Sequence, residues 1–131
     1  MKFSEIKKED WLALKPYLDT CLLPVTGLNG SESPVEAAER LEQLRDVLDL
    51  LERPYRGRTV TYPALHYTEA ESEAQQLVAD VVGRIREAGF RYVIIVTIIE
   101  AWEEMEIEGA DLVITPNSTE RISDLISSLW A

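Results

Sequence analysis

Hydrophobic residues recur at helical spacing in a long segment that begins near position 33. Ser33-Pro34-Val35-Glu36 is typical of a helix start, because the serine hydroxyl can cap the first turn, proline suits its first position and the glutamate completes a capping box. Beyond it, charged residues separate leucines that are spaced by three or four positions: Leu41, Leu44, Leu48 and Leu51. The sequence therefore predicts an amphipathic helix between Pro34 and Pro54.

A second long helix is predicted from another capping box, Thr68-Glu69-Ala70-Glu71. Gly89 is placed to end it, because glycine readily adopts the left-handed conformation of a C-terminal cap. One face of this helix is apolar and consists of Ala70, Ala74, Leu77, Val78, Val81, Val82 and Ile85.

Two shorter helices are predicted at the ends of the chain. The first covers residues 10–18 and is expected to bend near Pro16, which cannot donate a helical hydrogen bond. The last follows Asn117 or Ser118, either of which could cap it. Its apolar face consists of Ile122, Leu125, Ile126 and Leu129.

Shorter apolar segments between these helices predict four β-strands: residues 20–25, 59–62, 91–99 and 111–115. The third is apolar at nearly every position, so both of its faces must be covered, as in the central strand of a parallel sheet. Pro63 follows the second strand, which is expected at an edge because proline cannot donate to a central ladder. The alternation of strands and helices predicts an α/β layered domain.

The shortest connections place the strands in the order second, first, third, fourth. This arrangement is a small doubly wound, flavodoxin-like, mostly parallel four-stranded sheet with helices on both faces. The connection over residues 100–110 is barely long enough for a crossover, although residues 101–106 could supply one short helix. Without a crossover the fourth strand would run antiparallel, so its direction stays open.

Length and composition are those of one globular domain, residues 1–131, and the charge excludes several partners. Thirteen Lys and Arg against 24 Asp and Glu leave a net charge of −11, which argues against binding to nucleic acid or to anionic membrane surfaces. The sequence has no apolar run long enough to cross a bilayer and no secretory signal. A single cysteine, Cys21, fits the reducing cytoplasm, which is the expected location.

In open parallel sheets, ligands bind beyond the carboxyl ends of the strands, where the winding direction reverses. This crevice would lie between the loops after the first and third strands, and its candidate lining residues are Thr26, Asn29, Glu100, Trp102 and Asn117. Glu100 could serve as a general base if burial raised its pKa. Loop 26–31 is neither a Walker loop nor a dinucleotide motif, and Glu32 beside it would repel a phosphate.

The remaining polar clusters have simpler explanations. His66, the lone histidine, has no motif that ties a nucleophile to it, and Cys21 is expected to pack in the core as a small apolar residue. A solvated acidic cluster is expected from Glu100, Glu103, Glu104, Glu106, Glu108 and Asp111. An arginine knot would pair with acidic helices or receive an anionic ligand group, and consists of Arg53, Arg56 and Arg58. No catalytic residue, metal site or cofactor is assigned.

The pattern as a whole resembles the YpiF-like family of small uncharacterised bacterial proteins. The resemblance covers nearly the full chain and rests on Trp11, Asp19-Thr20, Leu22-Leu23-Pro24, Tyr62-Pro63 and Thr115-Pro116-Asn117. It implies a family of unknown function without established catalytic residues. The genes of such proteins lie near those of a quinol–cytochrome c reductase, which suggests respiratory assembly or regulation.

The leading prediction is a soluble binding, regulatory or assembly domain that acts through protein contacts, with a protein partner or as a homodimer. It rests on the absence of a catalytic triad, metal motif, P-loop or dinucleotide fingerprint in the sequence. The acidic cluster and Trp130, which would either dock onto the domain or contact another subunit, are the features that favour protein contact. The alternative is a small-ligand-binding protein or an enzyme that uses the crevice. Thermal-shift screening with nucleotides and metabolites distinguishes the two, because a bound ligand raises the melting temperature.

Overall fold

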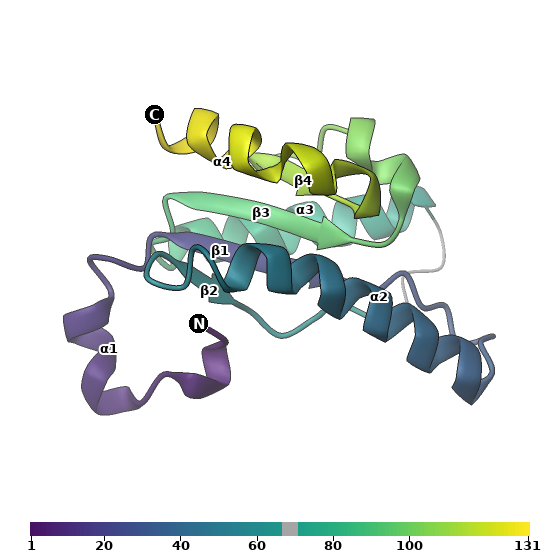
Figure 1. Ribbon diagram of the computed structural model, residues 1–131, viewed down its shortest axis with the longest axis horizontal. Helices are drawn as coiled ribbons and strands as arrows, with labels where there is room; N and C mark the ends of the chain where they lie inside the picture. The colour runs from purple at the N-terminus through teal and green to yellow at the C-terminus, as the bar shows by residue number, and fades with distance from the viewer. Residues whose placement is uncertain (67–70) are drawn as a thin grey trace.

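Figure 1 shows a four-stranded sheet with helices on both sides, in a computed structural model that describes residues 1–66 and 71–131. The strands are β1 (Thr20–Val25), β2 (Thr59–Thr61), β3 (Tyr92–Thr97) and β4 (Leu112–Ile114), in the order β2-β1-β3-β4. All three neighbouring pairs are parallel. The predicted α/β fold and strand order are confirmed, and the fourth strand, whose direction was open, is parallel.

Two apolar cores lie on opposite faces of the sheet. The helices are α1 (Lys8–Leu14), α2 (Pro34–Glu52), α3 (Glu71–Glu87) and α4 (Ile122–Trp130), with 3-10 helices η1 (Phe3–Glu5), η2 (Glu100–Glu104) and η3 (Pro116–Arg121). Residues of α2 and α4 share one core with the sheet, whereas α3 and the N-terminal segment, residues 1–18, share the other. Among the helices that the structure describes, none has the length and apolar character of a membrane crossing.

β3 contributes alternately to the two cores. Val93 and Ile95 belong to the core on the α3 side, and Ile94 and Val96 belong to the core on the side of α2 and α4. All four side chains are fully buried. This double burial explains why the strand is apolar at consecutive positions and not at alternate ones, and it confirms its predicted central place.

The first helix is shorter than predicted. α1 ends at Leu14, because Pro16 has no amide hydrogen with which to continue the helical ladder. The connection between β3 and β4 contains the 3-10 helix η2 at the place where a short helix was expected. The capping box predicted at 68–71 falls largely outside the described residues, and α3 is described from Glu71.

The cap of the last helical segment also differs from the prediction. Thr115, not Asn117 or Ser118, is the capping residue, and its hydroxyl accepts the Asn117 N–H at 3.2 Å. The Ser118 hydroxyl in turn accepts the Thr115 N–H at 3.2 Å. Pro116 accounts for the shift, because proline favours the first helical position and the residue before it becomes the cap.

The start of the chain covers the outer edge of β2. Lys2 forms a parallel bridge with Thr61, whose N–H donates to the Met1 carbonyl at 2.7 Å. The Met1 α-amino group donates to the Thr59 carbonyl at 2.7 Å. β2 therefore lies at the edge of the sheet, as Pro63 predicted. Some of the backbone hydrogen-bonding groups on its outer edge are nevertheless covered by the N-terminal segment.

Only the second half of α2 packs on the sheet. The predicted capping box is present, since the Ser33 hydroxyl accepts the Glu36 N–H and the Glu36 carboxylate accepts the Ser33 N–H. The buried residues of the helix begin only at Leu44, and none of residues 34–43 is buried. Figure 1 shows this part of α2, here called the α2 arm, projecting beyond the sheet.

Candidate functional site

The predicted crevice lies where β1 and β3 end side by side, with Val25 opposite Thr97. Two of its five candidate residues, Thr26 and Trp102, are buried. The other three, Asn29, Glu100 and Asn117, are exposed. All five are described, and no hydrogen bond joins any two of them. The structure therefore places two of the candidates inside the fold and three at the surface.

Trp102 belongs to the core. Its side chain is 2% exposed and lies in the apolar cluster on the α3 side of the sheet. η2, which follows β3 directly, turns the chain back toward that cluster, and the Trp102 N–H donates to the Ile99 carbonyl at 3.0 Å. The Trp102 ring is therefore packed in the core on the α3 side of the sheet.

Thr26 is also satisfied internally. Its N–H donates to the Leu65 carbonyl at 2.9 Å, and its hydroxyl lies 3.2 Å from the same oxygen. The hydroxyl also lies 3.2 Å from Nδ1 of His66, an exposed residue. These contacts tie the segment after β2 to the end of β1 and account for the polar group at this buried position.

In the loop after β1, neighbouring backbone N–H groups point to one place and form an amide nest, which the Glu32 side chain of the same chain occupies. The Glu32 carboxylate accepts the N–H groups of Asn29 and Gly30, each at 3.0 Å, and lies 3.2 Å from Nη1 of Arg40. Its side chain is 5% exposed. The hydrogen bond from the Asn29 N–H is the largest of the effects that lower the pKa of Glu32. A carboxylate thus occupies the place that an anionic ligand would take in such a loop.

Gly27 holds this loop against the end of β3. Its φ is +72°, a left-handed conformation that favours glycine, and a Cβ there would lie 2.9 Å from Cγ1 of Ile99. The close approach brings the loop down onto the sheet.

Two residues of the acidic cluster form ion pairs and hydrogen bonds within the chain. Glu103 pairs with Arg121 and accepts the hydroxyl of Ser118 at 2.7 Å. Asp111 pairs with Arg86 and accepts the Val93 N–H at 2.9 Å. Within the described parts of the chain, no group of three or more His, Cys, Asp or Glu side chains could hold a metal ion.

Each arginine of the knot pairs with an acidic residue of the same chain, and Arg53 lies 3.8 Å from Asp49 of α2. Arg58 forms two hydrogen bonds with Asp19, at 2.9 and 3.1 Å, and Arg56 contacts Glu5 at 2.8 Å. Partial burial alone would raise the pKa of Asp19, but the hydrogen bonds from Arg58 and Thr20 outweigh it and the pKa is lowered. The cationic groups are therefore engaged within the molecule.

Trp130 docks onto its own domain. Its Nε1 donates to the Thr20 hydroxyl at 3.1 Å, and the Arg58 guanidinium lies 4.1 Å from its ring centroid. Tyr55 packs edge-on against the same ring at a centroid distance of 5.2 Å. Cys21, buried as expected in the β1 strand, has a thiol pKa raised by desolvation. Cys21 is fully buried, whereas Trp130 is half-buried and uses its ring N–H within the chain.

Two open grooves lie away from the crevice, and none of the five candidates lines them. The larger, of about 680 Å³, runs beside β4 among Glu106, Gly109, Leu112 and Leu125. The second, of about 470 Å³, is here called the N-terminal groove and is lined by Phe3, Ile6, Lys7, Lys8, Trp11, Val60, Tyr62, Pro63 and Phe90.

Aromatic rings form much of the N-terminal groove. Phe90 packs against Tyr62 at 5.3 Å and against Trp11 at 6.4 Å between ring centroids. Phe3 lies at its margin and remains 48% exposed. Lys7 and Lys8 are exposed, and neither forms an ion pair with any residue that the structure describes. The groove is therefore apolar in its interior and cationic at its rim.

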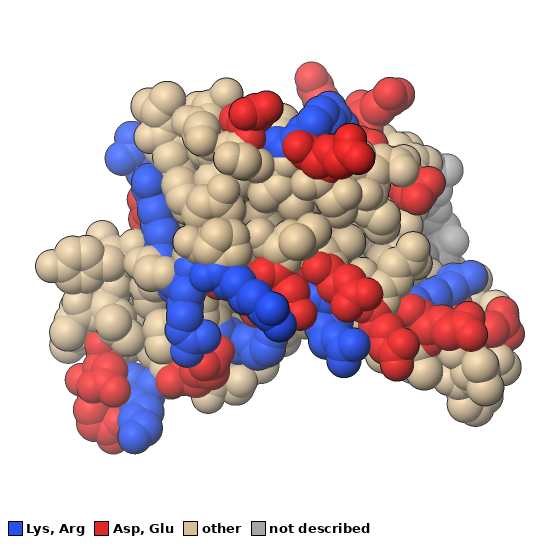
Figure 2. Space-filling view, viewed as in Figure 1, with Lys and Arg blue, Asp and Glu red and all other residues tan. Residues whose placement is uncertain are grey.

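The charge of the N-terminal segment differs from that of the rest of the chain. Residues 1–18 contain all four lysines and three acidic residues, whereas residues 19–131 contain nine arginines and 21 acidic residues. Figure 2 shows acidic and basic side chains interspersed across the lower part of this face, a largely uncharged area in its middle and a further charged group at its top. The sequence reasoning missed the groove, although this partition of lysine and the aromatic residues of the segment were signals for it.

Comparisons with known proteins place the chain in a family. A family model described as "Protein of unknown function (DUF2487)" matches residues 9–125. The chain is also 24% identical over 124 residues to the "Uncharacterized protein YpiF" of Bacillus subtilis (strain 168), a match that covers 95% of this chain and 83% of that protein. No solved structure matches it. The resemblance predicted from the sequence is confirmed, and the chain belongs to the DUF2487 family.

Proposed function

We propose that this chain is a non-catalytic binding domain that acts through protein contacts. The observation that carries the proposal is the N-terminal groove, where exposed apolar side chains and unpaired lysines meet. Grooves of this kind accept an amphipathic helix that lays its apolar face onto the aromatic floor. The lysine rim favours a partner segment with acidic side chains beside its apolar ones.

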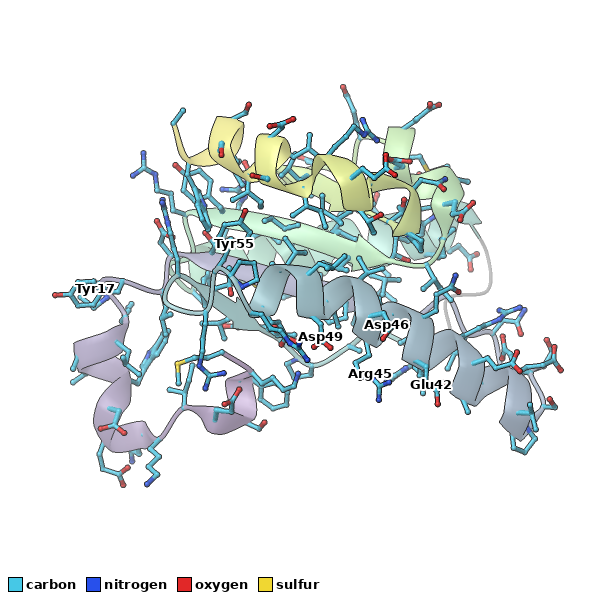
Figure 3. All side chains as sticks on the ribbon, viewed as in Figure 1. Tyr17, Glu42, Arg45, Asp46, Asp49 and Tyr55 are labelled. Atoms are coloured by element: carbon cyan, nitrogen blue, oxygen red, sulfur yellow. The ribbon has the colours of Figure 1, made fainter. Side chains whose placement is uncertain are left out.

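The neighbouring surface supports the same proposal. Leu12 and Tyr17 are both strongly exposed, and Figure 3 shows Tyr17 pointing away from the body of the domain. Together with Phe3 they leave three large apolar side chains exposed within the N-terminal segment. Tyr17 lines a separate groove with Met1 and Leu14, so the exposed apolar surface of the segment extends beyond the N-terminal groove.

The crevice gives little support to a catalytic role. Its amide nest is filled by Glu32, Trp102 is part of the core and the Thr26 hydroxyl is hydrogen-bonded internally. Catalysis would require a nucleophile, base or anion site open to a substrate. A protein-contact role needs only the surface described above.

The experiment is photo-crosslinking in the native host, with a photoreactive phenylalanine analogue at Phe3. The matched control carries the analogue at Leu77, which is similarly exposed on α3. We expect a discrete protein adduct from position 3 that is absent at position 77 and is lost when Lys7→Glu and Lys8→Glu are added. The absence of any adduct at position 3, or equal adducts at both positions, contradicts the proposal.

A further inference from the structure

The α2 arm has the chemistry that the N-terminal groove would bind. Val35 is 67% exposed and Leu41 is 40% exposed, although both are apolar residues of a regular helix. With Ala38 they are spaced three residues apart, which forms a ridge along one side of the helix. Glu39 and Glu42 lie on the same exposed part of α2. The arm is therefore an acidic helix with an unburied apolar ridge.

From these two surfaces we infer that the occupant of the N-terminal groove is the α2 arm of a second copy of this chain, an inference that rests on the proposed function. The groove supplies an aromatic floor for the ridge of Val35 and Leu41. Its rim lysines, Lys7 and Lys8, face the carboxylates of the arm. Helix-in-groove contacts use apolar anchors at this spacing, with charges at the rim that select the partner.

Charge favours the α2 arm of the second copy over other parts of that copy as the segment that binds in the groove. Two copies that each carry a net charge of −11 repel one another at a distance. Electrostatics favours a contact between them where a basic surface meets an acidic one. The N-terminal segment is the stretch that holds all the lysines, and the Glu39 and Glu42 carboxylates make no ion pair with any described residue.

The positions of the two surfaces allow the contact to be reciprocal. Figure 1 shows the N-terminal segment and the α2 arm at opposite ends of the molecule, both extending downward past the β2 edge in this view, although the segment and α2 pack on opposite faces of the sheet. In Figure 2 the surface between them is hollowed. A two-fold axis through this hollow brings the arm of each copy to the groove of the other. The assembly then closes as a dimer with two equal contacts and does not extend into a filament.

The outer face of the second half of α2 would lie along the dimer axis. Figure 3 shows Glu42, Arg45, Asp46 and Asp49 on the lower side of α2, pointing away from the sheet. Three of the four are acidic and one is basic, so the pairing of Arg45 with an acidic residue of the other chain is the attraction that this face could offer to its own copy. The two end contacts nevertheless carry the inference, because they bury the apolar side chains.

The test compares two charge-reversed variants by sedimentation velocity of the full chain. Glu39→Lys/Glu42→Lys makes the arm basic, and Lys7→Glu/Lys8→Glu makes the groove rim acidic. In either variant alone both contacts of a dimer are repulsive, so we expect the dimer dissociation constant to rise by about tenfold or more. The control, Glu73→Lys/Glu87→Lys on α3, changes the net charge by the same amount and sign as the arm variant and should leave the dimer intact.

Mixing the two variants gives the decisive result. In the mixed dimer the basic arm meets the acidic rim at one contact, and the unaltered arm and rim meet at the other. We therefore expect an equimolar mixture to form dimers when each variant alone is monomeric. Circular dichroism of each variant verifies that it is folded.

Three results overturn the inference. The first is a wild-type chain that stays monomeric up to about 500 μM, a concentration that exceeds weak dimer dissociation constants. The second is a dimer unaffected by both variants, and the third is failure of the mixture to restore the dimer. A monomeric chain that still gives the crosslink at Phe3 to a different protein overturns this inference and leaves the proposed function standing. Loss of both the dimer and the crosslink removes both.

Discussion

The crevice at the ends of β1 and β3 and the N-terminal groove differ in how their side chains are used. In the crevice the chain satisfies its own groups, since Glu32 fills the amide nest and Trp102 is buried in the core. In the groove, Phe3 stays half-exposed and Lys7 and Lys8 lack ion-pair partners among the described residues. At a place where strand topology favours ligand binding, nearby side chains of the same chain can occupy the polar groups that a ligand would use. An open surface can arise elsewhere, where a terminal segment packs incompletely on the domain.

The strongest challenge to this comparison is Trp102→Ala. If the ring is a core residue, its removal leaves a large cavity and lowers the free energy of unfolding by about 3–5 kcal/mol. Urea unfolding followed by circular dichroism measures the change, and Phe3→Ala in the groove is the matched aromatic control. A loss below about 1 kcal/mol would mean that Trp102 does not support the core, and the crevice would need to be reconsidered.

Thr26→Val tests the internal hydrogen bonds of the crevice with a side chain of similar shape. Loss of the hydroxyl contact with Leu65 should lower the free energy of unfolding by about 1 kcal/mol. The control is Thr119→Val, at a threonine for which the structure gives no side-chain hydrogen bond, and its effect should stay within about 0.5 kcal/mol. Equal values for the two variants would show that the Thr26 contacts add nothing to stability.

Glu32→Gln tests the filled amide nest through its pH dependence. The pKa of Glu32 is lowered in the folded chain, so its ionised form stabilises the fold at pH values above the ordinary value of 4.5. This contribution is lost as the pH falls through the lowered pKa. The stability difference between wild type and variant should therefore be constant near neutral pH and shrink below pH 4.5, as acid titrations of thermal unfolding would reveal. A difference independent of pH would contradict the assignment.

The smallest effect on stability is expected in the groove. Lys7→Gln/Lys8→Gln removes two exposed charges without ion-pair partners in the described chain, so the free energy of unfolding should change by less than about 0.5 kcal/mol. The same variant should weaken the crosslink at Phe3. A destabilisation well above that limit would identify the lysines as structural and would remove the contrast with the crevice.

Local patterns predicted most of the fold. The apolar run around Val93–Val96 specified a central strand, and Ser33-Pro34 specified the start of α2, because both signals depend on neighbouring residues. The cap at Thr115 was missed although Pro116 marked it. Trp102 was placed in a crevice because it follows β3 directly, and the turn of η2 that buries it could not be inferred from its position in the chain.

The site depended on contacts between residues distant in sequence. Trp130 meets Thr20 and Arg58, and the floor of the N-terminal groove combines Trp11, Tyr62 and Phe90. The positions of these residues in the sequence do not predict that they would be in contact. From the sequence, Glu32 was expected to repel an anion from the loop at residues 26–31. In the structure the Glu32 carboxylate itself accepts the N–H groups that an anion would bind.

By itself, the amino-acid sequence determined the elements, the order of the strands and the burial of β3, because these follow from periodicity, capping and the need to cover apolar faces. The tertiary structure alone decided the direction of β4, the filling of the amide nest by Glu32 and the opening of the N-terminal groove. These features depend on how closely separate segments approach in space. That approach is set by the packing of whole layers and not by the residues adjacent in the chain.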